Sequence, residues 1–323
     1  MANTLLEVRN LKQHYLIRKG LFSNNVYTYA VDGVSFTVKA GETLGLVGES
    51  GCGKSSLGRS LLKLNEPTSG QIIYDGQDIT HFTARQMVSL RKEIQIIFQD
   101  PMESLNSRHT IGRILQEPFD IHKIGTQAER TQKVKELLIK VGLPESAAER
   151  YPHEFSGGQR QRIGIARAIA LNPKLIVCDE AVSALDVSVQ SQIINLLLDL
   201  QATMNLALVF IAHDLSVVRH ISDNIAVMYL GRIVEMSDTS SLFARPQHPY
   251  TQALISAIPL PDPRSRKKRE PLKGDVPSPI SPPKGCHFES RCHFATEQCK
   301  TDYPQLKHVD NHHYVACHRI ETT

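Results

Sequence analysis

The sequence predicts an α/β protein whose core is a parallel sheet, and three observations support that prediction. Short apolar segments of the kind found in buried strands alternate with segments of helical periodicity. A glycine-rich stretch, residues 48–55, lies between one such strand and the helix that follows it. The chain has 323 residues, 41% of them hydrophobic, which is enough for one large domain with an appendage.

The elements of this fold are expected in a regular order along the chain. Apolar runs and alternating patterns predict strands at residues 5–11, 34–38, 43–47, 72–74, 94–98, 175–178, 206–212 and 225–229. Helical periodicity predicts helical segments at residues 54–64, 111–141, 158–171 and 187–203, with an amphipathic piece at 127–141. Asp75-Gly76 is a hairpin-type turn signal after the strand that ends at Tyr74.

Composition and charge exclude several classes of protein. The 37 Lys and Arg residues against 33 Asp and Glu leave a formal charge of only +4, which excludes polybasic nucleic-acid-coating proteins and acidic disordered ones. The longest apolar run, residues 206–212, is far shorter than the ~20 residues of a membrane-spanning helix. The N-terminus lacks the apolar core of a secretion signal, so we expect the chain in the cytosol.

The composition changes after residue 258. Residues 259–283 are rich in proline and predict an extended surface linker, in which the basic run 264–269 is a solvated face. Residues 284–323, the tail, are too few for an independent hydrophobic core, so another interaction must hold them. We expect a change of one tail cysteine to serine to loosen the tail while leaving the chemistry of Lys54 and Glu180 intact, because the two sites lie on separate segments.

Residues 48–55, Gly-Glu-Ser-Gly-Cys-Gly-Lys-Ser, match the P-loop pattern. Its glycines let backbone N–H groups turn toward phosphate oxygens, and the helix that follows adds its dipole. We expect Lys54 to reach the β- and γ-phosphates of ATP and the Ser55 hydroxyl to bind Mg²⁺. The predicted nucleotide contacts of this segment are Gly48, Ser50, Gly51, Cys52, Gly53, Lys54, Ser55 and Ser56.

Two carboxylates end the predicted strand at residues 175–178. Asp179 is expected to hold Mg²⁺, directly or through water. Glu180 points to the opposite side of the backbone trace and can polarise a water in line with the γ-phosphate.

A second anion-binding segment is predicted at Ser156, Gly157, Gly158 and Gln159. A serine and two glycines open a helix there, which exposes backbone N–H groups at its N-terminus. One nucleotide does not need two such cradles, so this one is expected to serve the nucleotide of a second subunit. With Asp179 placed 23 residues after Ser156, the sequence resembles the ABC-type ATPases.

The resemblance implies roles for further residues. Gln99 corresponds to a glutamine that senses Mg²⁺ and the attacking water, and His213 to a histidine that contacts the γ-phosphate. Tyr15 is the candidate for the aromatic ring that stacks on adenine, although Tyr27 and Tyr29 also precede the P-loop. Ala181 stands where such families usually carry proline, which removes a fixed φ angle from the loop.

Residues 248–254 and 282–288, with Arg291-Cys292 after them, are similar to the oligopeptide/dipeptide/nickel importer ATPases. Residues 11–15 and 151–155 also resemble the F-type subunit of these importers. The resemblance implies an enzyme that hydrolyses ATP to power the import of di- or oligopeptides. It also implies a second, paralogous ATPase subunit, two membrane permease subunits and an extracytoplasmic peptide-binding protein, but no nucleic acid. The chain would lie peripherally on the cytoplasmic face of the inner membrane. Dipeptide, longer oligopeptide, haem and nickel all remain open as substrates.

The alternative class is a soluble ABC ATPase that acts on ribosomes or DNA. Ribosomal members usually carry two ATPase cores in one chain, whereas this chain has one P-loop. DNA-repair members split the core with a long coiled coil, for which residues 56–155 leave no room. These features favour the transporter.

Four of the six cysteines lie in the tail: Cys286, Cys292, Cys299 and Cys317. Four thiolates can bind a [4Fe–4S] cluster or Zn²⁺. The resemblance favours the cluster, with zinc and with free or disulfide-linked cysteines as alternatives. The expected fold is thus an ABC-type P-loop ATPase with a parallel core sheet, an antiparallel β subdomain, a helical subdomain and a metal-binding extension. We expect its boundaries at residues 1–258, with the helical subdomain at about 100–170, then 259–283 and 284–323.

Overall fold

The computed structural model describes residues 4–17, 25–258, 274–310 and 312–320. Their contacts divide the chain into two compact units. Unit 1 comprises residues 39–42 and 82–211, and unit 2 comprises residues 4–38, 43–81 and 212 onward.

The sheet of unit 1 is parallel, as the sequence predicts. Its strands follow the order β8 (Ala207–Ala212), β7 (Leu175–Asp179), β6 (Ile94–Ile97), and both pairings are parallel. Every residue of β7 and β8 is buried. Strands covered on both faces read as continuous apolar runs, which is why these segments are recognisable in the sequence.

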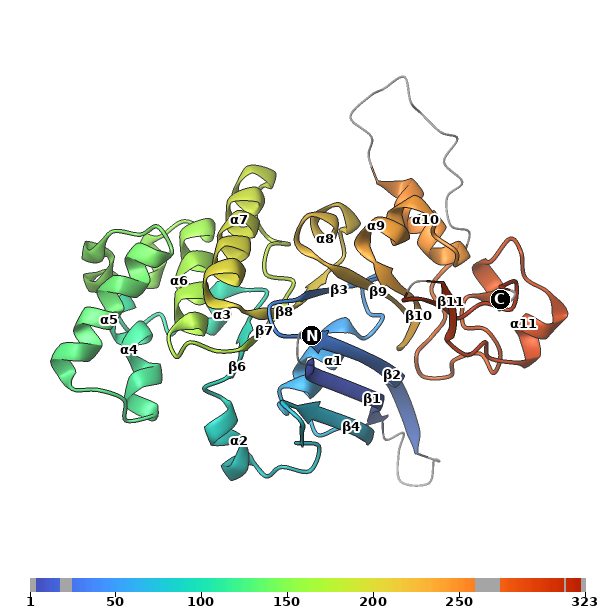
Figure 1. The fold of residues 1–323 in the computed structure, drawn as a ribbon, viewed down its shortest axis with the longest axis horizontal. Helices are drawn as coiled ribbons and strands as arrows, with labels where there is room; N and C mark the ends of the chain where they lie inside the picture. The colour runs from blue at the N-terminus through green and yellow to red at the C-terminus, as the bar shows by residue number, and fades with distance from the viewer. Residues whose placement is uncertain (1–3, 18–24, 259–273, 311, 321–323) are drawn as a thin grey trace, which may run out of the picture. The chain divides into compact units, whose positions relative to one another are not determined.

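Most helices of the structure belong to unit 1. They are α2 (Ala84–Leu90), α3 (Pro101–Ser104), α4 (Ile111–Ile121), α5 (Gln127–Lys140), η1 (Glu145–Glu149), η2 (Pro152–Glu154), α6 (Gly157–Ile169) and α7 (Val187–Met204). Helices α4, α5 and α6 contact one another and form one helical group (Figure 1).

The helical segment predicted at residues 111–141 is two helices. Lys123 and Gly125 adopt left-handed backbone angles, with φ of 55° and 68°, and interrupt the helical path. Thr126 then starts α5 with a capping box, in which its side chain accepts from the Glu129 N–H and the Glu129 carboxylate accepts from the Thr126 N–H. Helix α5 lies where the amphipathic piece at 127–141 is predicted, whereas periodicity carries no signal at the short turn before it.

Unit 2 contains an antiparallel sheet in the order β2 (Val26–Lys39), β1 (Thr4–Ile17), β4 (Ser69–Tyr74), β5 (Gln77–Asp78). The predicted turn joins β4 to β5, with φ of 48° at Asp75 and 78° at Gly76. Two positive φ angles match the twist of a tight hairpin. Strands β1 and β2 are longer than predicted, because their outer parts contain few buried apolar residues.

A second set of strands in unit 2 follows the order β11 (Lys307–Asp310), β12 (His313–Val315), β10 (Arg232–Asp238), β9 (Asn224–Tyr229), β3 (Thr43–Val47). Strands β3 and β9 are parallel, and the other pairs are antiparallel. The helices of unit 2 are α1 (Lys54–Leu61), α8 (Leu215–Ile221), α9 (Thr239–Ala244), α10 (Pro249–Ala257), η4 (Glu289–Arg291) and α11 (Glu297–Thr301).

The tail adds strands and one aromatic side chain to the core of unit 2. Strand β12 pairs with β10, and β11 pairs with β12 at the edge. Phe288 is fully buried, with its ring 5.3 Å from that of Tyr229 and 5.4 Å from that of Tyr250. The tail therefore needs no core of its own, because it shares one with the strands before it.

The predicted linker is only partly described. Residues 259–273, which include the basic run 264–269, lie outside the described residues. Residues 274–283 form no helix or strand, and the carbonyl of Pro279 accepts a hydrogen bond of 2.9 Å from the Tyr29 N–H. Within the described ranges, no helix has the length and apolarity needed to cross a membrane.

Replacing Phe288 with alanine is expected to release the tail. Truncation of a buried phenylalanine costs about 3–5 kcal/mol, through lost burial and the cavity it leaves. Limited proteolysis should then cut the Phe288→Ala variant within the tail faster than the parent protein. Phe294→Ala is the matched control, because that ring is 47% exposed. Equal cleavage rates for both variants would contradict the docking role of Phe288.

Stability should fall between pH 6.5 and 4 because His248 is buried as a neutral ring. Its Nδ1 accepts the Tyr250 N–H at 3.1 Å, and burial lowers the pKa of His248 to about 4 against the opposing attraction of Glu235. In this window the unfolded chain binds more protons, so acid favours unfolding by up to about 3 kcal/mol. The His248→Asn variant keeps a side-chain oxygen that can accept the Tyr250 N–H, but it has no group that takes up a proton in this pH window.

Thermal unfolding measured from pH 4 to 7 checks this expectation. The His248→Asn variant should show a shallower pH dependence than the parent. His287, whose pKa burial also lowers to about 4, is present in both proteins and cancels in the comparison. Identical slopes would show that His248 does not titrate as described.

Candidate functional site

The P-loop follows β3 and depends on two glycines for its path. Gly48 has φ of 155° and Gly53 has φ of 104°. A Cβ at Gly48 would lie 2.1 Å from the Met228 carbonyl oxygen, and a Cβ at Gly53 would lie 1.8 Å from the Ala30 carbonyl oxygen. Only glycine fits at these positions, and the loop that they permit has the tight form that a phosphate cradle requires.

Lys54 is the first residue of α1, and its side chain folds back onto the loop. The Nζ atom donates to the carbonyl oxygens of Gly48 at 2.8 Å and Glu49 at 3.1 Å. The buried ammonium group thus lies against the loop that the sequence predicts it to serve. Ser55 and Ser56 follow in the first turn of α1, half-buried, while Ser50 and Gly51 are exposed at the tip.

Glu49 has partners that the sequence analysis missed. Its backbone N–H donates to the Tyr250 hydroxyl at 2.8 Å. Its carboxylate accepts two hydrogen bonds from the Arg291 guanidinium, at 2.6 and 3.0 Å. Glu49 occupies a variable position of the P-loop pattern, and its partners lie some 200 residues or more further on, so no local signal marks them.

Cys52 and Tyr15, two other predicted nucleotide contacts in unit 2, differ in their surroundings. Cys52 is buried, and burial raises the pKa of its thiol, as expected for an inert small residue. Tyr15 lies on β1 with a 37% exposed side chain, and its hydroxyl accepts from Asn65 Nδ2 at 2.8 Å. Tyr29, by contrast, packs edge-on against His14, with ring centroids 4.5 Å apart. Tyr15 is therefore partly exposed, and its stacking on adenine stays a prediction.

In unit 1 the structure brings Gln99 and Glu180 together. The Gln99 Nε2 donates to Glu180 Oε2 at 3.0 Å, across 81 positions of sequence. Glu180 has a left-handed φ of 49°, and its N–H donates to the Ile211 carbonyl oxygen at 3.1 Å. Such a conformation at a non-glycine residue costs of order 1–3 kcal/mol and is common at functional sites. Asp179, just before it, is buried at the end of β7.

The segment at residues 156–159 forms the N-terminus of α6. Ser156 is the N-cap and shares a capping box with Gln159, whose N–H donates to the serine hydroxyl at 3.3 Å. A Cβ at Gly158 would lie 2.4 Å from Val189 Cγ1 of α7, so this glycine also permits close packing of two helices. Ser156, Gly157 and Gln159 are exposed, as an anion-binding helix end requires.

His213 is the first residue after β8, and its side chain is exposed. The next residue, Asp214, caps α8 by accepting the Ser216 N–H at 2.7 Å. The cap sets the start of α8, so His213 lies between the last residue of β8 and the N-cap of α8. Its predicted contact with a γ-phosphate stays a prediction.

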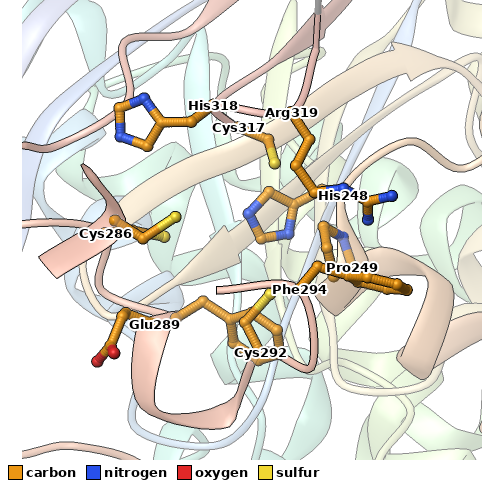
Figure 2. A pocket seen from close by; sticks show the side chains of 11 residues that line it. His248, Pro249, Cys286, Glu289, Cys292, Phe294, Cys317, His318 and Arg319 are labelled. Atoms are coloured by element: carbon orange, nitrogen blue, oxygen red, sulfur yellow. The ribbon is translucent and has the colours of Figure 1, made fainter. Parts of the chain in front are cut away.

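The four tail cysteines line one pocket together with His248, Phe288 and Arg319 (Figure 2). All four are free thiols. Burial raises the pKa of Cys286 to about 11 and also raises the pKa of Cys292 and Cys317. Cys299 exchanges a hydrogen bond with the Thr296 hydroxyl at 3.4 Å. Burial thus favours the neutral thiol at Cys286, Cys292 and Cys317.

The predicted [4Fe–4S] cluster, and its zinc alternative, are wrong. Throughout the described ranges, no three or more His, Cys, Asp or Glu side chains are grouped in a way that could hold a metal ion. The tail also does not need a metal to hold it, because β12 and Phe288 attach it to the core of unit 2. The description of residues 284–323 as a metal-binding extension is corrected accordingly.

Comparison with known proteins agrees with this geometry. Residues 31–183 match the family described as ABC transporter, and residues 234–299 match the family described as oligopeptide/dipeptide transporter, C-terminal region. The chain is 56% identical over 319 residues to the oligopeptide transport ATP-binding protein AppF of Bacillus subtilis, covering 98% of this chain and 97% of that protein. It is 51% identical to the putative oligopeptide transport ATP-binding protein YkfD of the same species, covering 97% and 95%.

Solved structures of ATP-binding cassettes share the fold. The cassette MJ0796, solved as a dimer bound to ADP and Pi, superposes with a TM-score of 0.65 at 27% identity, covering 73% of this chain and 99% of that one. CbiO1 of Clostridium perfringens gives a TM-score of 0.65 at 28% identity, covering 75% and 91%. The chain belongs to the ATP-binding subunits of ABC transporters, within their oligopeptide/dipeptide group. It is accordingly an ATPase that uses ATP with Mg²⁺.

Proposed function

We propose that this chain hydrolyses ATP to power the import of di- or oligopeptides through a membrane ABC transporter. The observation that carries the proposal is the match of residues 234–299 to the C-terminal region of oligopeptide/dipeptide transporters. The solved cassettes cover only 73–75% of the chain, so it is longer than those cassettes. Relatives named for oligopeptide transport match it over nearly their whole length.

The nucleotide contacts follow from the two glycine-dependent cradles. In the P-loop, backbone N–H groups and the Lys54 ammonium bind the β- and γ-phosphates. Tyr15 stacks on the adenine ring. The oxygen atoms of Ser55 and Asp179, with Gln99, suit a hard cation such as Mg²⁺. When bound, Mg²⁺ neutralises negative charge on the phosphates.

Hydrolysis is assigned to three side chains. Glu180 accepts a proton from the attacking water, and its carboxylate is held by the hydrogen bond from Gln99. Gln99 therefore orients the base as well as sensing the nucleotide. His213 contacts the γ-phosphate and stabilises charge that develops there.

The exposed N-terminus of α6 serves a nucleotide held by another ATPase subunit. Ser156, Gly157, Gly158 and Gln159 are not part of the P-loop, yet they form a second anion cradle. The related cassette solved as a dimer with ADP and Pi supports pairing of two ATPase chains. We propose a paralogous ATPase as the partner, below two permease subunits on the cytoplasmic face of the inner membrane. An extracytoplasmic binding protein delivers the peptide.

The substitution Glu180→Gln should lower ATP turnover by roughly 10²–10⁴-fold while ATP binding remains, the usual size of a general-base contribution. The amide keeps the shape and a hydrogen bond to Gln99 but cannot accept the proton of water. Turnover and equilibrium ATP binding are measured on the same preparations. Glu136→Gln, on the surface of α5, is the matched control. Turnover of Glu180→Gln within twofold of the parent would remove Glu180 from the catalytic role.

Peptide import is tested in vesicles that contain the purified permeases and both ATPase subunits, with the binding protein inside or outside as orientation requires. Uptake of labelled di- and oligopeptides should depend on ATP and be lost in Lys54→Ala, because that variant loses phosphate binding. The isolated chain should hydrolyse ATP far more slowly than the assembly, since each site needs α6 of a partner. Full activity of a verified monomer, or ATPase activity that responds to ribosomes and not to peptide, would reject the proposal.

A further inference from the structure

The tail of unit 2 contacts the P-loop through a charged pair. Arg291, at the end of η4, donates from Nη1 and Nη2 to the two carboxylate oxygens of Glu49, at 2.6 and 3.0 Å. The arginine side chain is only 6% exposed. A two-bond contact between planar groups fixes orientation as well as distance. The pair therefore holds one residue of the P-loop in a defined place.

The two groups that contact Glu49, the Tyr250 hydroxyl and the Arg291 guanidinium, are both attached to one cluster of aromatic rings. The Tyr250 hydroxyl accepts the Glu49 N–H, and Arg291 Nη1 lies 3.5 Å from the Tyr229 hydroxyl. The rings of Tyr229 and Tyr250 are 4.7 Å apart, and Phe288 of the tail packs against both. The loop residue is thus anchored through backbone and side chain by segments that the tail completes.

The Arg291–Glu49 pair changes the net charge that the P-loop presents to ATP. Glu49 places a negative side chain in a loop that must accept a triphosphate, and it cancels the positive charge of Lys54. Arg291 neutralises Glu49 at hydrogen-bond distance, so the three side chains together carry one positive charge. Removal of the arginine would leave a partly buried carboxylate unpaired beside the phosphates, which weakens anion binding.

We propose that Arg291 is a positioning residue for ATP binding: by neutralising and orienting Glu49, it makes nucleotide affinity depend on the folded tail. Under this proposal the tail and the P-loop do not act separately, since the two segments share an ion pair across 242 positions. The proposal rests on ATP binding by the chain and does not depend on which substrate is imported.

The first test measures the equilibrium dissociation constant of MgATP for the purified full-length chain. Arg291→Gln should weaken ATP binding roughly tenfold, about 1.4 kcal/mol. Arg319→Gln is the matched control, because Arg319 is also a tail arginine but lies over the Phe294 ring at 3.8 Å. The control should bind within twofold of the parent. Parent-like affinity of Arg291→Gln, or an equal loss in Arg319→Gln, would overturn the proposal.

A double-mutant cycle separates this electrostatic role from a loss of tail folding. In a Glu49→Gln background, adding Arg291→Gln should change ATP affinity less than twofold, because no carboxylate remains to be neutralised. Arg291→Lys should recover part of the affinity, since it restores the charge without the two-bond geometry. A tenfold loss that persists in the Glu49→Gln background would show that Arg291 acts only by holding the tail or by touching phosphate itself, and the proposal would fall.

Discussion

The P-loop depends on backbone segments that approach too closely for any side chain. Gly53 passes the Ala30 carbonyl and Gly48 passes the Met228 carbonyl where a Cβ would overlap the oxygen atom. Both neighbours belong to strands of unit 2, so the loop is shaped by the sheets around it as much as by its own sequence. Lys54 donates to two carbonyl oxygens of this loop, so its ammonium lies against the segment that we propose as the phosphate cradle.

How much of the fold and of the site could be predicted depends on how far apart in sequence the interacting residues lie. The strands that contain residues 94–97 and 175–179 are apolar runs, and the P-loop is a local pattern, so both are visible in the sequence. The Gln99–Glu180 hydrogen bond was not predicted, and neither was the Arg291–Glu49 pair, because each joins residues that are distant in sequence. The resemblance to a family supplied Gln99 as a candidate, but only the fold places it beside Glu180.

The prediction of a metal in the tail failed for a related reason. Cysteine spacing is compatible with a cluster, with zinc or with free thiols. A metal was expected to hold the tail because a segment of 40 residues is too short for a core of its own, which is true only of an isolated segment. Strand β12 instead extends the sheet of unit 2, and Phe288 enters an aromatic group with Tyr229 and Tyr250. Strand addition and aromatic docking leave no periodic signal in a tail this short.

A buried carboxylate fixes how the tail strand meets the sheet. Glu235 of β10 is fully buried, and it accepts hydrogen bonds from the Gln247 N–H at 2.7 Å and the His248 N–H at 2.9 Å. His313 Nε2 of β12 lies 2.7 Å from the same carboxylate. Because each hydrogen bond lost by a buried carboxylate is costly, any other register of β12 would lose the His313 partner and be disfavoured. One acidic residue thus ties together β10, the start of α10 and the tail, and these elements supply Tyr250 and Arg291 to the P-loop.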